Sequence, residues 1–214
     1  FADQAEEAEF IASRIEELQN EGLDSGKIAV LFRAAYHSQA LEMELVKCGI
    51  DYVYRGGVRF FERAHIKDVL AYLRIINNIE DAVAWRRVLN MQIGIGPAMA
   101  ERVIGEIFNS PLEGGAGGVG RLNGIGAQLS AKAQIGWADF LQIYQKLISL
   151  PLQGGGEEGV SERTNPTPPS PHRGGNPGDL IQEILDSKYS EYLENEYPDY
   201  RERRQDIEQL AKYA

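Results

Sequence analysis

Residues 56–73 decide how this chain must be divided, and they read Gly56-Gly57-Val58-Arg59-Phe60-Phe61-Glu62-Arg63-Ala64-His65-Ile66-Lys67-Asp68-Val69-Leu70-Ala71-Tyr72-Leu73. The glycine pair permits a sharp turn. Beyond it, apolar residues recur at the spacing of one helix face, at Ile66, Val69, Leu70, Leu73 and Ile76. The stretch therefore predicts that the fold changes near Gly57, and no strand pattern follows it.

Upstream of this boundary, helical and extended patterns alternate. Asp3 can cap a first helix, and residues 28–32 form a short apolar run of the kind found in buried parallel strands. Ser38 can cap a second helix, and residues 50–54 favour a second strand. This order predicts an α/β domain over residues 1–57.

Downstream, residues 58–214 predict an all-α domain. Further helices are expected from Pro97 at a first helical position, around the apolar stripe that begins at Trp137, after a cap at Asp179 and from about Asp199. Two stretches interrupt the helices as predicted flexible linkers, the glycine-rich residues 113–120 and residues 153–178, which are rich in Gly, Pro, Ser and Thr.

Charge and composition narrow the classes of function. The net charge of -10 disfavours non-specific nucleic-acid binding by the chain as a whole. Residues 54–104 are the exception, because they hold eight arginines and lysines against five acidic residues. No apolar run approaches the roughly 18 residues that a membrane span needs. The single cysteine, Cys48, excludes an internal disulfide and fits a reducing cytoplasm.

Several segments, in fixed order and spacing, resemble superfamily 1 DNA helicases of the UvrD/PcrA/Rep type. They are residues 28–33, Ser38, residues 49–52, 56–61 and 63–74, and Gly94-Ile95-Gly96. The resemblance implies the end of a second RecA-like domain within residues 1–57, followed by the inserted helical domain of this family. It implies an ATP-dependent 3′-to-5′ DNA helicase or translocase of the bacterial cytoplasm, acting in repair or replication.

Two motifs of the family's nucleotide site do not occur in this sequence. There is no Gly-x-x-x-x-Gly-Lys-Ser/Thr phosphate loop, and no Asp-Glu pair follows a strand to hold magnesium. We therefore expect ATP with magnesium to be the cofactor of the full-length protein, and this fragment to be inactive alone.

Arg33 is the candidate catalytic residue, and it stands with Phe32 as a candidate nucleotide contact. Arg33 follows the predicted strand directly, where ligands bind in α/β sheets. The resemblance implies that its guanidinium reaches the γ-phosphate, where it would hold phosphate oxygens and stabilise charge. Phe32 stands where the family often has a ring that stacks on adenine. A surface arginine and a buried strand residue are the alternatives.

The segment 54–61 combines arginines, glycines and aromatic rings. Arginines meet phosphates, glycines allow close backbone approach, and rings stack on bases. By resemblance the segment borders the channel for single-stranded DNA, with Arg55, Gly56, Gly57 and Arg59 as candidate contacts. A turn with a hydrophobic plug is the alternative.

The helix start at Gly94-Ile95-Gly96 resembles the family's glycine motif for gripping duplex DNA. A helix N-terminus favours a phosphate oxygen, and the glycines leave its backbone accessible. Lys67 lies on the polar face of its helix, and the resemblance implies that it contacts the duplex backbone. A tight turn and a solvated lysine are the alternatives.

Three other functions remain open from the sequence. The first is a non-catalytic DNA-binding module, and the second is a platform that docks repair or transcription proteins through an acidic helical surface. The third is a helicase–nuclease fusion of the AddA or RecB kind. The expected partner in the favoured interpretation is DNA, as a single strand and at the duplex junction, with no membrane.

Overall fold

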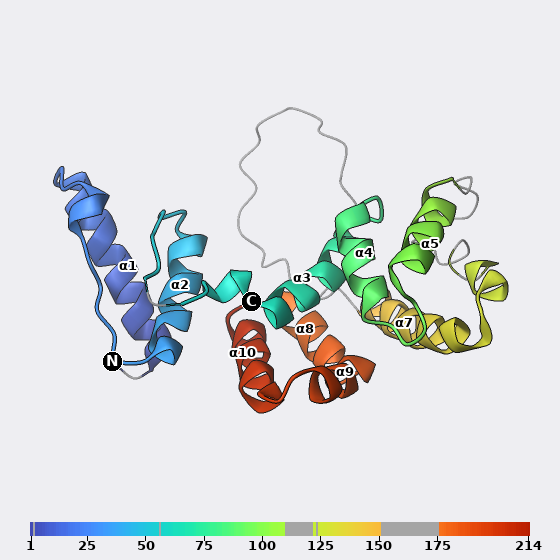
Figure 1. Ribbon diagram of the computed structural model, residues 1–214. Helices are drawn as coiled ribbons and strands as arrows, with labels where there is room; N and C mark the ends of the chain where they lie inside the picture. The colour runs from blue at the N-terminus through green and yellow to red at the C-terminus, as the bar shows by residue number, and fades with distance from the viewer. Residues whose placement is uncertain (2, 56, 110–121, 123, 151–175) are drawn as a thin grey trace. The chain divides into compact units, whose positions relative to one another are not determined.

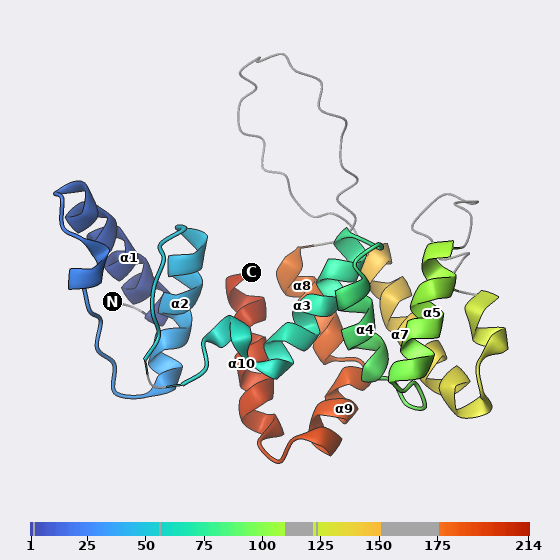
Figure 2. The same ribbon diagram turned by 45° about the horizontal axis from the view of Figure 1, so that its top comes forward.

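The computed structural model of this protein describes residues 1, 3–55, 57–109, 122, 124–150 and 176–214. Contacts divide the chain into two compact units, built mainly of Phe1–Ala64 and His65–Lys212. Figures 1 and 2 show helices joined by loops in both units. No helix of the described ranges is long and apolar enough to cross a membrane.

The first unit is built on two helices, α1 (Gln4–Asn20) and α2 (Ser38–Lys47), which lie side by side in both views. Asp3 caps α1 as predicted, since its carboxylate accepts from the backbone N–H groups of Ala5 and Glu6 at 2.9 and 3.0 Å. Small and branched apolar side chains fill the contact between the helices: Ala8, Ala12 and Ile15 from α1, and Ala40, Leu41 and Leu45 from α2.

The prediction of an α/β domain over residues 1–57 was wrong. No strand occurs among the described residues, and 28–32 and 50–54 are irregular. Leu31 is 93% exposed, and Val30 and Phe32 are also exposed. A parallel strand needs hydrogen-bonded neighbours in a sheet, which an apolar run cannot supply for itself. The first unit is therefore a helix pair with extended connections, and no RecA-like sheet is present in the described residues.

The second unit is helical throughout its described part, as predicted. Its helices are α3 (Ala64–Asn77), α4 (Ala82–Asn90), α5 (Pro97–Asn109), α7 (Ala131–Ser149), α8 (Pro177–Leu185), α9 (Lys188–Glu196) and α10 (Tyr200–Tyr213). Consecutive helices pack in pairs, α4 with α5, α7 with α8, and α8 with α9. A series of local pairings thus builds this unit.

Aromatic side chains form the core of the second unit. Phe140 lies at its centre, with its ring centroid 5.2 Å from that of Trp85 and 5.3 Å from that of Trp137. Both indole N–H groups find backbone acceptors, at 2.7 Å on Ile79 and 3.1 Å on Leu122. Burying each such ring contributes about 2–3 kcal/mol.

Helix starts were predicted with mixed success. The start of α5 at Pro97 is confirmed. Asn176, rather than Asp179, caps α8, and its side-chain oxygen accepts from the N–H of Gly178 at 3.0 Å. Residues 113–120 and most of 153–178 lie outside the described residues.

Candidate functional site

A pocket of about 250 Å³ in the first unit brings together the two residues predicted to contact nucleotide. Phe32 and Arg33 line it, together with residues of α1, the preceding loop, and His37 and Leu41. The Arg33 side chain is exposed, and nothing in the described ranges forms a hydrogen bond or ion pair with its guanidinium. The structure therefore leaves this cation available at the pocket.

Phe32 is held from one side by a second aromatic ring. Its centroid lies 5.6 Å from that of Tyr54, and the two planes are inclined by 18°, which is a stacked arrangement. The Phe32 side chain remains 39% exposed. Sequence reasoning placed Tyr54 only within the segment 54–61, and its contact with Phe32 was not anticipated.

Glu42 links α2 to the segment 54–61, which carries the predicted contacts to single-stranded DNA, and to Tyr52 just before it. Its side chain is 2% exposed, and its Oε2 accepts from the Tyr52 hydroxyl at 3.0 Å and from the Phe60 N–H at 2.9 Å. Oε1 accepts from Ser38 Oγ at 3.0 Å. Burial, followed by the charge of Glu42, raises the pKa of Tyr52 to about 12, so this hydroxyl keeps its proton for the bond. Sequence reasoning missed this junction.

The candidate contacts in the segment 54–61 differ in availability. Arg55 is exposed and makes no ion pair among the residues that the structure describes, whereas Gly56 lies outside those residues. Gly57 is exposed, and a β-carbon there would approach the Tyr54 ring at 3.4 Å. Arg59 donates to the Tyr52 carbonyl at 2.8 Å and lies over the Tyr52 ring. Part of the Arg59 guanidinium is thus already used.

Ion pairs absorb much of the positive charge in residues 54–104. They join Arg74 to Asp81 and Arg87 to Asp68, each at 2.7 Å, and also Arg86 to Glu101 and Arg102 to Glu106. Lys67, by contrast, is exposed on α3 without a hydrogen-bonded or charged partner in the described part of the chain. Few of the basic side chains in residues 54–104 are therefore left without an acidic partner in the described part of the chain.

The loop Gly94-Ile95-Gly96 packs closely against the start of α7. Gly94 has a φ of 77°, and a β-carbon on it would lie 2.7 Å from backbone atoms of Lys132 and Ala133. Ile95 is 3% exposed, and its N–H donates to the Gln92 carbonyl at 3.1 Å. The Ile95 side chain is therefore a core residue and only the backbone of the loop can face a ligand.

Gly96 has a different environment from Gly94. Both glycines are exposed, but a β-carbon on Gly96 would meet no atom within 4 Å. The Gly96 carbonyl accepts from the N–H of Ala100 at 2.9 Å in the first turn of α5. None of the described acceptors takes the N–H of Gly94 or Gly96. The packing of Gly94 fits a tight turn. The open surroundings of Gly96 leave room for a phosphate at the start of α5.

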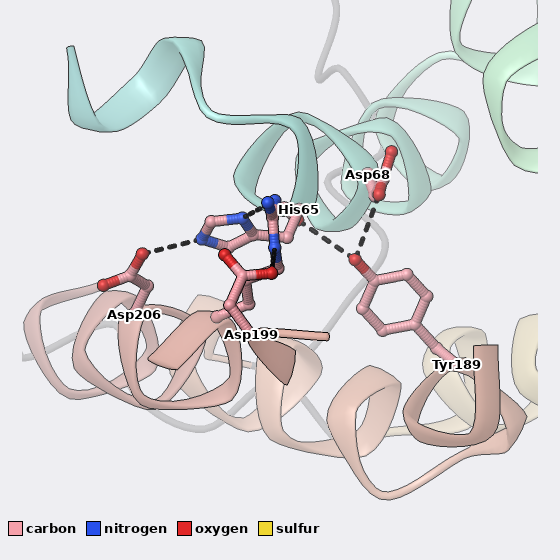
Figure 3. A network of polar contacts seen from close by, with 6 residues as sticks. His65, Asp68, Tyr189, Asp199 and Asp206 are labelled. Carbon is pink, nitrogen blue, oxygen red and sulfur yellow. Dashed lines mark hydrogen bonds and ion pairs between the residues drawn. The ribbon is translucent and has the colours of Figure 1, made fainter. Parts of the chain in front are cut away.

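A buried polar network joins α3 to the last helices of the second unit (Figure 3). His65 is 3% exposed, and its Nε2 lies 2.8 Å from Asp206 Oδ2, while its Nδ1 lies 3.1 Å from Arg203 Nη1. Arg203 also pairs with Asp199 at 2.8 Å. The sequence did not predict this network.

Asp68 continues the polar contacts on the same helix. Its Oδ2 accepts from the Tyr189 hydroxyl at 3.2 Å, and its Oδ1 accepts from Arg87 Nε at 2.7 Å. Burial raises the pKa of Asp68, and Arg87 opposes that rise. These bonds connect α3, α4 and α9, and they give the network a structural role.

Comparison of the sequence with known protein families identifies the family of this chain. The UvrD-like helicase C-terminal domain matches residues 1–110, just over half of the 214 residues. The chain therefore belongs to the UvrD-like helicase family, as the motifs predicted.

The relatives that it matches are bacterial DNA helicases. The chain is 45% identical over 95 residues to DNA helicase II of Haemophilus influenzae, which covers 44% of this chain and 13% of that protein. It is 35% identical over 163 residues to the ATP-dependent DNA helicase UvrD1 of Mycobacterium tuberculosis, covering 74% of this chain and 21% of the relative. It is 35% identical over 99 residues to the ATP-dependent DNA helicase PcrA of Bacillus subtilis, covering 45% and 13%. The chain thus spans about a fifth or less of these relatives.

Proposed function

We propose that this chain is the part of an ATP-dependent 3′-to-5′ DNA helicase that carries a phosphate-sensing arginine and a duplex-binding helical unit. One observation carries the proposal: Phe32 and Arg33 line the same pocket, and the Arg33 guanidinium is exposed. A ring beside a cation suits a nucleotide, because the ring stacks on the base and the guanidinium holds phosphate oxygens. The names of the relatives support ATP as that nucleotide.

In the proposed mechanism, the rest of the full-length protein supplies the phosphate loop and the magnesium ligands. ATP with magnesium would supply the phosphoryl group whose transfer drives movement along DNA. Arg33 would stabilise the charge that develops on the transferred phosphoryl group. Loss of that group would remove the contact with Arg33 and so signal the nucleotide state. Arg55, Gly56, Gly57 and Arg59 would contact the single strand, while Lys67 and the Gly94-Ile95-Gly96 backbone would contact duplex phosphates.

Steady-state hydrolysis of ATP by the full-length protein tests the role of Arg33. With saturating single-stranded DNA, Arg33→Ala should lower kcat by about tenfold or more, since an arginine that stabilises transition-state charge contributes at least that much. Arg14→Ala is the matched control, because Arg14 is an exposed arginine of the same unit that pairs with Glu17. Normal hydrolysis by Arg33→Ala would refute the assignment.

A further inference from the structure

Glu42 occupies a position between the two functional segments of the first unit. Its carboxylate accepts from Ser38 at the start of α2, which follows the loop of Arg33, and from Tyr52 and Phe60. Tyr52 and Phe60 stand on either side of the segment with Arg55, Gly57 and Arg59. The Glu42 carboxylate thus bonds to residues on both sides of the proposed contacts to single-stranded DNA.

The Ser38 hydroxyl connects this carboxylate to the Arg33 side. Ser38 Oγ lies 2.8 Å from the Ala35 carbonyl and 3.0 Å from Glu42 Oε1. A serine hydroxyl has one proton, so it can donate to only one of these acceptors at a time. A shift of the loop that carries Ala35 therefore changes the bonding of Glu42.

The Tyr52 side of the junction reaches Arg59. Tyr52 donates its hydroxyl to Glu42, and its carbonyl accepts from Arg59 at 2.8 Å while the guanidinium lies 5.1 Å from the ring centroid. Tyr52 therefore connects the Glu42 carboxylate to the Arg59 guanidinium.

The burial of the Glu42 carboxylate depends on these neutral donors. Glu42 is 2% exposed, and no arginine or lysine in the described ranges forms an ion pair with it. A buried carboxylate needs hydrogen-bond partners in place of water, and here they are the Ser38 hydroxyl, the Tyr52 hydroxyl and the Phe60 N–H. The residues that supply these donors therefore fix the place of the carboxylate.

We propose that Glu42 is a positioning residue that couples the pocket of Arg33 to the segment 54–61, which carries the proposed contacts to single-stranded DNA. This inference rests on the proposed function of both sites. It assigns Glu42 no contact with nucleotide or DNA. Its effect should therefore appear in the stimulation of hydrolysis by DNA, and not in the affinity for ATP.

The test measures ATP hydrolysis by the full-length protein with and without single-stranded DNA. Glu42→Ala should keep its KM for ATP and its DNA-free rate within about twofold of the unmodified protein, and lose about tenfold in stimulation by DNA, as expected when two or more hydrogen bonds are lost. Glu42→Gln should restore stimulation, because its amide oxygen can accept from Tyr52 and Phe60 while its NH₂ group faces Ser38. Glu42→Gln as damaged as Glu42→Ala would overturn the proposal.

Tyr52→Phe keeps the test decisive if Glu42→Ala fails to fold. It removes one donor to the carboxylate and keeps the ring under Arg59. About a fivefold loss of stimulation is expected for one hydrogen bond, with KM for ATP unchanged. Normal stimulation in Tyr52→Phe would contradict the coupling role.

Arg33→Ala in the same assay separates the two proposals. If Arg33→Ala hydrolyses ATP normally, the function proposed for the pocket fails. If Arg33→Ala is impaired while Glu42→Ala and Tyr52→Phe are stimulated normally, only the inference about Glu42 fails.

Discussion

His65 and Asp206 are 141 residues apart in the sequence, and their side chains meet at 2.8 Å in the buried part of the second unit. Arg203 can only donate, so the His65 Nδ1 that it contacts must accept, and Nε2–H must donate to Asp206. His65 thus joins α3 to α10 through both of its ring nitrogens. The contact links the first helix of the unit to its last.

Loss of this contact should destabilise the protein. His65→Ala leaves the mostly buried Asp206 carboxylate without the imidazole, and we expect the free energy of unfolding to fall by about 2–4 kcal/mol. Urea unfolding measures the change. Glu208→Ala is the control, because it removes only an exposed pair with Arg204 and should cost less than about 1 kcal/mol. Equal effects in the two variants would show that His65 contributes no more than a surface contact.

Two glycines of the second unit should respond to alanine in opposite directions. Gly94→Ala adds a β-carbon 2.7 Å from the backbone of α7 at a φ of 77°, so we expect a loss of about 2–4 kcal/mol. Gly105 lies inside α5, and a β-carbon added there would meet no atom within 4 Å outside its own stretch of helix. Gly105→Ala should therefore raise the free energy of unfolding by about 0.5–1 kcal/mol. Thermal unfolding of both variants decides the matter, and a stable Gly94→Ala would contradict the close packing of this loop.

The Tyr52 hydroxyl should make stability depend on alkaline pH. Its pKa is raised from 10 to about 12, so the folded chain holds the proton more tightly than the unfolded chain. The resulting stabilisation is complete below pH 10 and is lost as the pH rises through about 12. Unfolding in urea at a series of alkaline pH values should show a smaller decline for Tyr52→Phe. Identical declines for the two proteins would count against a raised pKa of Tyr52 in the folded chain.

Lys67 should contribute to duplex binding through charge alone. Because it has no described partner on α3, Lys67→Ala should weaken binding of the full-length protein to duplex DNA and reduce the slope of log affinity against log salt by about 1. Lys146→Ala serves as the control, since Lys146 already pairs with Glu183 at 3.0 Å. An unchanged salt dependence in Lys67→Ala would remove Lys67 from the interface.

The sequence predicted the helices of the second unit because their signals are local. The apolar stripe of α3 and the proline that begins α5 lie within single turns of helix. Residues 28–32 were misread because strand formation depends on partners that are distant in sequence, and an apolar run does not reveal whether they exist.

The sequence indicated candidate residues for the site and did not indicate their geometry. The motif indicated Phe32 and Arg33, and the structure places both at one pocket. Glu42 gave no signal, because a glutamate in an amphipathic helix usually faces solvent. Its burial depends on donors from Tyr52 and Phe60, which lie 10 and 18 residues away.

The most direct test of the proposed function is strand displacement by the full-length protein on partial duplexes with a 3′ or a 5′ single-stranded tail. We predict that the protein unwinds the 3′-tailed duplex only when ATP and magnesium are present, leaves the 5′-tailed duplex intact, and loses about tenfold or more of its rate in Arg33→Ala. Unwinding from the 5′ tail, or unwinding that neither requires ATP nor depends on Arg33, would contradict the account.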